Sequence, residues 1–210
     1  MSYKTTKYVL LLASGLMLGT SAWADDWSLS LLVGNCISCH GPNGSSLGPA
    51  TPTIAGMHEE TFVDAMEEYQ NGERPSTIMG RIAKGYSEED FQRMADYFTK
   101  QPFVRHPQTV DEAKAKKGRE LHEKYCEKCH KDDGYTDDEG SSILAGQWMP
   151  YLQFSLADFH SGVRDMSKKM KKRMRKMVKA KGEKSLDDIV HFYGSQTRSG
   201  VKRSTDDDDD

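Results

Sequence analysis

The sequence predicts an all-α protein built from two tandem copies of one small helical domain. Similar residues recur at a constant offset of 90 positions in the two halves, and apolar side chains near the end of each half recur at helical spacing. No segment alternates polar and apolar residues as a half-buried strand would. The 210 residues are sufficient for two domains of this size.

The repeat involves residues of several types. Adding 90 to the residue number pairs Leu31 with Leu121, Gly44 with Gly134, Ile54-Ala55-Gly56 with Leu144-Ala145-Gly146, Tyr69 with Phe159, Gly72 with Gly162 and Arg74 with Arg164. Between the copies, Pro102 and Pro107 enclose a segment without helical periodicity, which places the boundary near Gln101 to Thr109. We therefore predict domains at residues 25–104 and 105–200.

Helices are expected at both ends of each copy. Residues 87–90 resemble a helix N-terminal cap, and the apolar residues that follow at helical spacing are Phe91, Met94, Ala95 and Phe98. In the second copy Ser185 to Asp188 occupy the corresponding place, followed by Ile189, Val190, Phe192 and Tyr193. Further helices are expected around residues 29–33 and 113–125.

The first 24 residues have the pattern of a secretory signal peptide. Lys4 and Lys7 precede an apolar run from Tyr8 to Leu18, and Ala22-Trp23-Ala24 then provides small residues at a plausible cleavage site. A membrane anchor is the alternative, but the run is shorter than the ~20 apolar residues that span a bilayer. We expect residues 1–24 to be removed and the mature chain to be periplasmic, without direct membrane insertion.

The charge distribution excludes one class of partner and distinguishes the two halves. A net charge of −3 lacks the basic excess of nucleic-acid binders, so no nucleic-acid partner is expected. Residues 25–100 contain 12 acids and 5 bases, whereas Lys168 to Lys181 contain nine Lys or Arg. This basic run is either a solvated helix face or a docking surface. Residues 201–210 form an acidic tail, expected to be disordered.

Each half contains one Cys-x-x-Cys-His motif, ending at His40 and His130. Disulfides would not account for a histidine after each cysteine pair. Zinc would have enough ligands, but structural zinc sites are not usually built as two separated units of this kind. The motif is the attachment signature of c-type haem. We therefore predict two covalently bound c-type haems, attached through Cys36, Cys39, Cys126 and Cys129.

The histidine of each motif is the expected proximal iron ligand, and a methionine sulfur is the expected sixth ligand. Met79 lies 39 residues after His40. Met170 lies 40 residues after His130, with Met166 at 36 residues as the alternative. Methionine also fills gaps in protein cores, and several methionines of this segment share one helix face, so packing is the competing interpretation.

Each half has the plan of a class I cytochrome c: an N-terminal helix, a haem motif, a ligand loop and a C-terminal aromatic helix. Three stretches outside the bare motif, 76–87, 121–130 and 143–153, resemble the di-haem cytochrome subunits of flavocytochrome c sulfide dehydrogenases. The resemblance extends over residues 30–196, and the acidic tail departs from it. The resemblance implies that the residues that hold the first haem are Cys36, Cys39, His40 and Met79. Those that hold the second haem are Cys126, Cys129, His130 and Met170.

The resemblance implies a FAD-containing flavoprotein partner in a heterodimer. The partner would oxidise sulfide and pass single electrons to this chain, which would hand them to a soluble or membrane-bound acceptor. The chain has no Gly-x-Gly-x-x-Gly fingerprint, so it is not expected to bind the flavin itself. Since the resemblance places sulfide oxidation on the partner, this chain is expected to be an electron-transfer subunit and not itself an enzyme. A free di-haem carrier of the c-four type is the alternative function. A haem enzyme with an open iron, such as a peroxidase, is a third.

Overall fold

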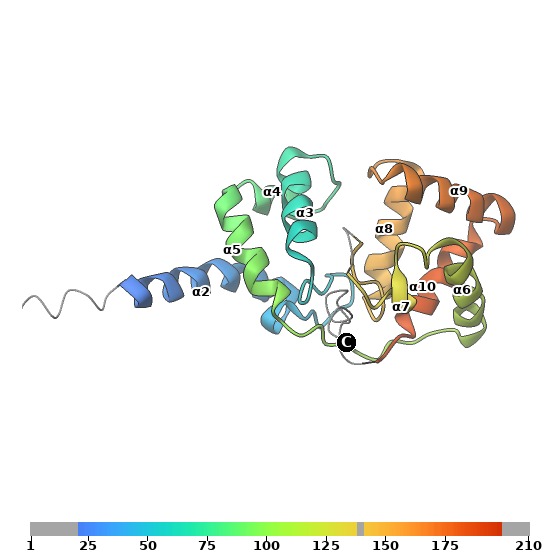
Figure 1. The fold of residues 1–210 in the computed structure, drawn as a ribbon, viewed down its shortest axis with the longest axis horizontal. Helices are drawn as coiled ribbons and strands as arrows, with labels where there is room; N and C mark the ends of the chain where they lie inside the picture. The colour runs from blue at the N-terminus through green and yellow to red at the C-terminus, as the bar shows by residue number, and fades with distance from the viewer. Residues whose placement is uncertain (1–20, 138–140, 199–210) are drawn as a thin grey trace, which may run out of the picture.

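The computed structural model describes residues 21–137 and 141–198, and every regular element within these ranges is a helix. The predicted all-α class is therefore confirmed. In chain order the elements are α2 (Ser21–His40), the 3-10 helix η1 (Pro42–Gly44), α3 (Glu59–Asn71), α4 (Met79–Ala83), α5 (Glu88–Thr99), α6 (Glu112–Tyr125), α7 (Lys131–Gly134), α8 (Met149–Ser161), α9 (Lys168–Lys181) and α10 (Lys184–Gly194). Figure 1 shows α2 to α5 and α6 to α10 as two groups side by side.

The two groups repeat one structure. Helices α3 and α8 have the same length of 13 residues, and each residue number of α3 plus 90 gives its counterpart in α8. Both helices end at a glycine, Gly72 or Gly162, in the left-handed conformation that glycine adopts without steric cost (φ 78° and 81°). The sequence repeat is therefore a structural repeat in this part of the chain.

Each group has its own hydrophobic core. Aromatic and aliphatic residues of α5 fill the first core, and those of α10 fill the second. The spacing of these side chains agrees with the helical periodicity of the sequence. The most deeply buried members are Phe91, Met94 and Phe98 in the first core and Ile189, Val190 and Phe192 in the second.

The start of α5 has the expected cap. The Ser87 side chain accepts a hydrogen bond from the Asp90 backbone, and the Asp90 carboxylate accepts one from the Ser87 backbone. This reciprocal capping box satisfies two donors that a helix N-terminus otherwise leaves unpaired.

The corresponding prediction for Ser185 is wrong. Gly56 N donates to Phe98 O and Gly146 N donates to Tyr193 O, both at 2.8 Å, so Phe98 corresponds to Tyr193 at an offset of 95. At that offset Ser185 is not the counterpart of Ser87. It lies inside the first turn of α10, where its hydroxyl donates to the Gly182 carbonyl at 2.6 Å.

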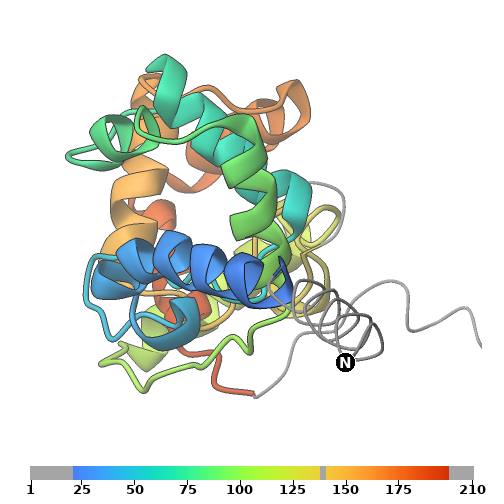
Figure 2. The same ribbon diagram turned by 90° about the vertical axis from the view of Figure 1, so that its left-hand side faces the viewer.

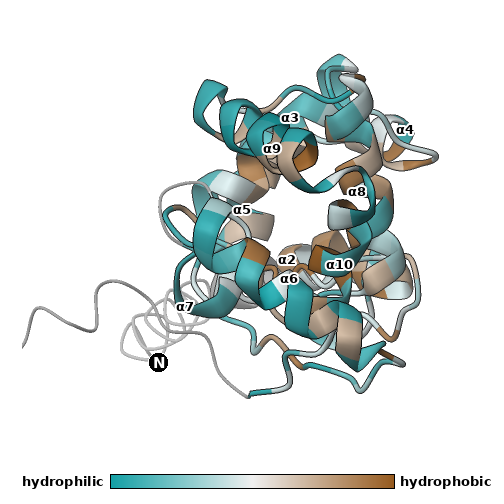
Figure 3. Cartoon of the chain, turned by 90° about the vertical axis from the view of Figure 1, so that its right-hand side faces the viewer, coloured by the Kyte–Doolittle hydropathy of each residue, from teal (hydrophilic) through white to brown (hydrophobic). Residues whose placement is uncertain are grey.

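The clearest difference between the groups is the helix before the last one. Helix α4 has 5 residues, whereas α9 has 14 and is capped by Ser167, whose side chain accepts a hydrogen bond from the Met170 backbone. Met174 and Met177 of α9 are buried, and most of its basic side chains are exposed. The second copy has therefore gained helical turns in this segment. The hydrophilic runs of α9 and α6 are visible in Figure 3.

The two groups meet across a polar contact. Gln147 Nε2 donates to Thr53 O at 2.9 Å, and Thr53 N donates to Gln147 Oε1 at 3.0 Å. The Trp148 indole donates to Ser46 O at 3.1 Å. Residues 102–110 connect the groups without regular structure and pass below them in Figure 1. Figure 2 shows α2 crossing in front of the first group.

The predictions for the two ends of the chain fall largely outside the described residues. Residues 1–20 and 199–210, with most of the signal peptide and the acidic tail, are among them. Helix α2 begins at Ser21, so the predicted cleavage site after Ala24 lies in its first turn. None of the described helices is both long and apolar enough to cross a membrane.

Candidate haem sites

The two Cys-x-x-Cys-His motifs lie in equivalent places, one in each group. The first forms the end of α2, and the second follows α6 in a helical turn, where His130 N donates to Cys126 O at 3.0 Å. The first cysteine of each motif packs against the core of its group, and the second is exposed. The cysteines are free, and no three-ligand grouping in the described ranges includes one of them. The described residues thus form neither the disulfide nor the zinc arrangement.

His40 has the environment of a metal-binding imidazole. Its Nδ1 atom lies 2.7 Å from the carbonyl oxygen of Pro52. Burial lowers the pKa of His40 and this contact only partly opposes the effect, so the ring is neutral at neutral pH. A neutral ring that donates from Nδ1 to a carbonyl leaves the Nε2 lone pair available for a metal.

His130 occupies the equivalent place in the second group. Burial lowers its pKa to about 4, with a further lowering from nearby His122. The Ser142 backbone, 90 positions after Pro52, acts in the opposite direction without reaching hydrogen-bond geometry to Nδ1. His130 is therefore also a neutral imidazole at neutral pH, which is the form that binds iron.

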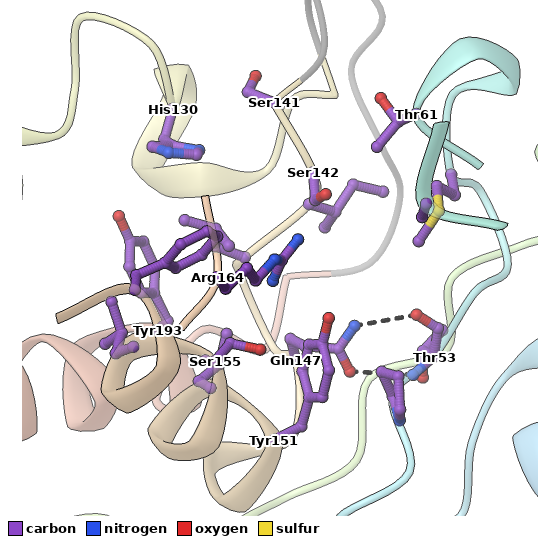
Figure 4. Close-up of a pocket in the computed structure, with 18 of the residues that line it drawn as sticks. Thr53, Thr61, His130, Ser141, Ser142, Gln147, Tyr151, Ser155, Arg164 and Tyr193 are labelled. Carbon is purple, nitrogen blue, oxygen red and sulfur yellow. Dashed lines mark hydrogen bonds between the residues drawn. The ribbon is translucent and has the colours of Figure 1, made fainter. Parts of the chain in front are cut away.

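A cavity of about 240 Å³ lies between the two groups. His130, Met170 and Tyr193 line it from the second group, and Thr53 lines it from the first. Figure 4 shows His130 and Tyr193 on one side of this cavity and Thr53, bonded to Gln147, on the other. The predicted ligand Met170 thus shares a cavity with His130, whereas the alternative Met166 is not among the lining residues.

In the first group, the predicted ligand Met79 is the first residue of α4. It is half-buried and packs against the first core. His40 does not line the cavity described above, so Met79 and His40 are not placed together there. Their assignment rests on the sequence spacing.

Two arginines at equivalent positions face the same cavity. The Arg74 guanidinium donates to the Tyr151 hydroxyl at 2.9 Å, and the buried Nε atom of Arg164 has no hydrogen-bond partner in the described ranges. Burial acts to raise the pKa of Tyr151, but the two guanidinium groups and a hydrogen bond with Ser155 together outweigh it and lower the pKa. The cavity therefore places two guanidinium groups, with the carboxyl groups of Asp64 and Glu68 also in its lining, where they can pair with anionic groups such as the propionates of a haem.

Comparison with known proteins places these sites in a family. The family model for cytochrome c matches residues 30–101. Cytochrome c4 of Azotobacter vinelandii is 30% identical over 145 residues, which cover 61% of this chain and 69% of that protein. The chain belongs to the cytochrome c family. As a cytochrome c with two Cys-x-x-Cys-His motifs, it carries two c-type haems and is an electron-transfer protein.

This cytochrome is also similar in sequence to a sulfide dehydrogenase subunit and in fold to a solved cytochrome structure. The cytochrome subunit of sulfide dehydrogenase from Chlorobaculum tepidum is 42% identical over 64 residues, 30% of this cytochrome. The cytochrome spans 57% of that subunit's length. The crystal structure of reduced recombinant cytochrome c4 from Pseudomonas stutzeri matches with a TM-score of 0.69 at 23% identity, covering 80% of this cytochrome and 97% of that chain. This last match supports the fold of both halves.

The described residues of this cytochrome fit the haem at its second motif. They offer two thiols for attachment, and a neutral imidazole, a methionine and two half-buried guanidinium groups around one cavity. When bound, a c-type haem supplies an iron that alternates between the ferric and ferrous states. The protein attaches the group, fixes its ligands and keeps water away from it.

Two contacts of the site were not predicted from the sequence. Gln147 connects the two groups beside the cavity, and Tyr151 lies between the two arginines. The pairing of Tyr151 with Arg74 had no signal in the sequence, because 77 positions separate the two residues. The repeat did identify Arg74 and Arg164 as equivalent residues.

Proposed function

We propose that this cytochrome is an exported, periplasmic subunit that takes single electrons from a FAD-containing flavoprotein and passes them to a soluble or membrane-bound acceptor. The flavoprotein would form a heterodimer with it and oxidise sulfide. The observation that carries the proposal is the 42% identity to a sulfide dehydrogenase cytochrome subunit. A reduced flavin releases two electrons, and two haems store one electron each.

The proposal assigns the iron ligands as His40 and Met79 in the first domain and His130 and Met170 in the second. The cysteines attach the haems by thioether bonds, and the domains comprise residues 25–104 and 105–200. Met170 is supported by its place in the cavity with His130. Met166, four residues earlier, serves as a matched control in a ligand test.

The ligand test compares Met170→Ala with Met166→Ala. Loss of Met170 is expected to open the iron, so that the ferrous variant binds carbon monoxide and the ferric variant loses its methionine–iron absorption band. Met166→Ala is expected to behave as the unaltered protein. The reverse result would assign Met166 and not Met170 as the iron ligand. Ready binding of carbon monoxide by the unaltered protein would instead favour a haem enzyme with an open iron.

The partner test is co-purification from the native periplasm. A flavoprotein in stoichiometric amount, with haem reduction when sulfide is added to the complex but not to the separated cytochrome, is the expected result. Mass spectrometry of the same preparation determines whether residues 1–24 are absent and whether two haems are attached.

A free electron carrier is the second candidate function. The similarity to cytochrome c4 extends over 61% of this chain, against 30% for the sulfide dehydrogenase subunit. Isolation of all of the cytochrome without a flavoprotein, together with rapid electron delivery to a terminal oxidase, would support this function over the first.

A further inference from the structure

Three polar side chains form a continuous row from the second haem cavity to the surface. Tyr193 lines the cavity and is also within hydrogen-bonding reach of the Cys126 sulfur. Its hydroxyl lies 2.9 Å from Nδ1 of His122, and Nε2 of His122 is hydrogen-bonded to the Glu127 carboxylate. The His122 side chain is completely buried (0% exposed), whereas that of Glu127 is 43% exposed. The row thus connects a haem-attaching sulfur with solvent.

The first domain has apolar residues at all three corresponding positions. The offset of 90 relates His122 to Leu32 and Glu127 to Ile37. The matched backbone hydrogen bonds described above relate Tyr193 to Phe98. All three of these apolar side chains pack in or against the first core.

This difference shows that the fold does not require the polar row. Polar groups are costly to bury unless hydrogen bonds compensate for the lost water, and the first domain avoids that cost at the same three places. Both nitrogens of the buried His122 ring are satisfied, so the second domain maintains a complete chain of hydrogen bonds. Such a chain suits a role that needs a proton site near one haem.

We propose that Tyr193, His122 and Glu127 couple reduction of the second haem to the uptake of one proton, a coupling that the first haem lacks. One electron arrives from the donor, and one proton enters from solvent at Glu127. The proton resides on the His122–Glu127 pair. Reoxidation releases the electron to the acceptor and the proton to solvent. The proposal requires only the haem of the second motif and holds whichever partner supplies the electron.

Charged groups from several elements lie around the row, and the ligand atoms of His122, Glu127 and Asp133 lie within 4.8 Å of one another. Asp133 of α7 is paired with Arg119 of α6 at 3.2 Å, so these two charges largely cancel. From α9, the Arg173 guanidinium donates to the Tyr125 carbonyl at 3.4 Å. His130 is near enough to His122 for a charge on one to affect the other.

The sign of the effect follows from charge. Reduction removes one positive charge from the iron, so a nearby acid–base pair binds a proton more tightly. By reciprocity, protonation of the pair favours the reduced state, and loss of that proton at higher pH lowers the reduction potential. The potential of the second haem is therefore expected to fall as pH rises, and that of the first haem to stay nearly constant in the same range.

The test is potentiometric titration of the intact di-haem protein at a series of pH values, with the two haems distinguished by paramagnetic NMR. One haem should show a slope approaching about 59 mV per pH unit, the value for one proton per electron. Infrared difference spectra of reduction should show a change in the imidazole or carboxylate bands of the pair that is absent from Glu127→Gln.

The Glu127→Gln substitution preserves the size of the side chain and is expected to abolish the pH dependence of the reduction potential of the second haem. Glu123→Gln, at an exposed position of α6 without a hydrogen bond to His122, removes the same charge and should leave the slope intact. Tyr193→Phe introduces the side chain that the first domain has at this position. It provides a second variant if Glu127→Gln prevents haem attachment. Equal slopes for both haems, no slope for either haem, or an unchanged slope in Glu127→Gln would overturn the proposal.

Discussion

At the scale of single residues, Arg164 shows how a buried charge prepares a binding site. Its guanidinium lies over the Phe159 ring at 4.2 Å, as Arg74 lies over Tyr69 at 4.6 Å in the first domain. Burial lowers the pKa of Arg164, and the positive charge of Arg74 adds to this effect. Glu68 partly offsets this repulsion, and an anionic ligand in the cavity would stabilise both guanidinium groups further.

Arg164→Gln is expected to lower the reduction potential of the second haem, because the removed positive charge favoured the ferrous state. It should also lower the free energy of unfolding of the holoprotein by roughly 1.5–3 kcal/mol, the usual contribution of a hydrogen bond to a charged group. Potentiometry and denaturant titration test both effects. Arg175→Gln, at an exposed position of α9, is the control, and equal shifts in both variants would contradict this role of Arg164.

At the scale of helices, the capping box of α5 gives a prediction that depends on pH. Backbone and side-chain hydrogen bonds from Ser87 lower the pKa of Asp90. A carboxyl whose pKa is lowered by folding stabilises the folded state above its unfolded pKa, and this contribution is lost as pH falls through the folded value. Asp90→Asn should therefore destabilise the protein at neutral pH and have less effect in acid.

Denaturant titration at neutral and acidic pH measures this difference. Glu89→Gln, in the same helical turn but outside the capping box, controls for the general effect of removing a negative charge near a helix N-terminus. Ser87→Ala should lower the free energy of unfolding by about 1 kcal/mol. A pH-independent effect of Asp90→Asn would show that its carboxylate is not the stabilising group.

Helix α9 leads to a prediction about partner binding. Most of its nine basic side chains are exposed, and none is in an ion pair with another described residue. Like charges that remain exposed near a haem attract an acidic redox partner and accelerate encounter at low salt. Lys171→Glu with Lys172→Glu should slow electron transfer with an acidic partner and weaken its dependence on salt.

Stopped-flow measurement of the second-order rate at several salt concentrations tests this prediction. The matched control is Lys116→Glu with Lys117→Glu, which reverses two exposed charges on α6. If both double variants slow the reaction equally, the effect would come from net charge and not from α9.

The helices also show which parts of the fold could be predicted from the sequence. The sequence predicted α2, α5, α6 and α10, because amphipathic spacing is a local property, whereas it yielded no prediction for α3 and α8. The cap at Ser185 was wrong because the offset changes from 90 to 95 after the longer α9. The contact of Gln147 with Thr53 spans 94 positions, and no local pattern encodes such a pairing.

At the scale of the whole molecule, Gln147 is expected to determine whether the domains unfold together. Its side chain satisfies both the N–H and the C=O of Thr53, and it is almost completely buried (4% exposed). In Gln147→Met both backbone groups would lose their partner, and each buried unsatisfied group costs about 1–3 kcal/mol. Because each domain has its own core, the loss should weaken the contact between the domains more than either domain itself.

Calorimetry of Gln147→Met is therefore expected to show two separated unfolding transitions where the unaltered holoprotein shows one. Electron exchange between the haems, measured by NMR line broadening, should slow in the same variant, since the contact holds the two halves of the cavity together. Gln153→Met changes an exposed glutamine of α8 and should affect neither measurement. A single transition at an unchanged temperature in Gln147→Met would mean that the Arg74–Tyr151 and Trp148–Ser46 hydrogen bonds are sufficient to couple the domains.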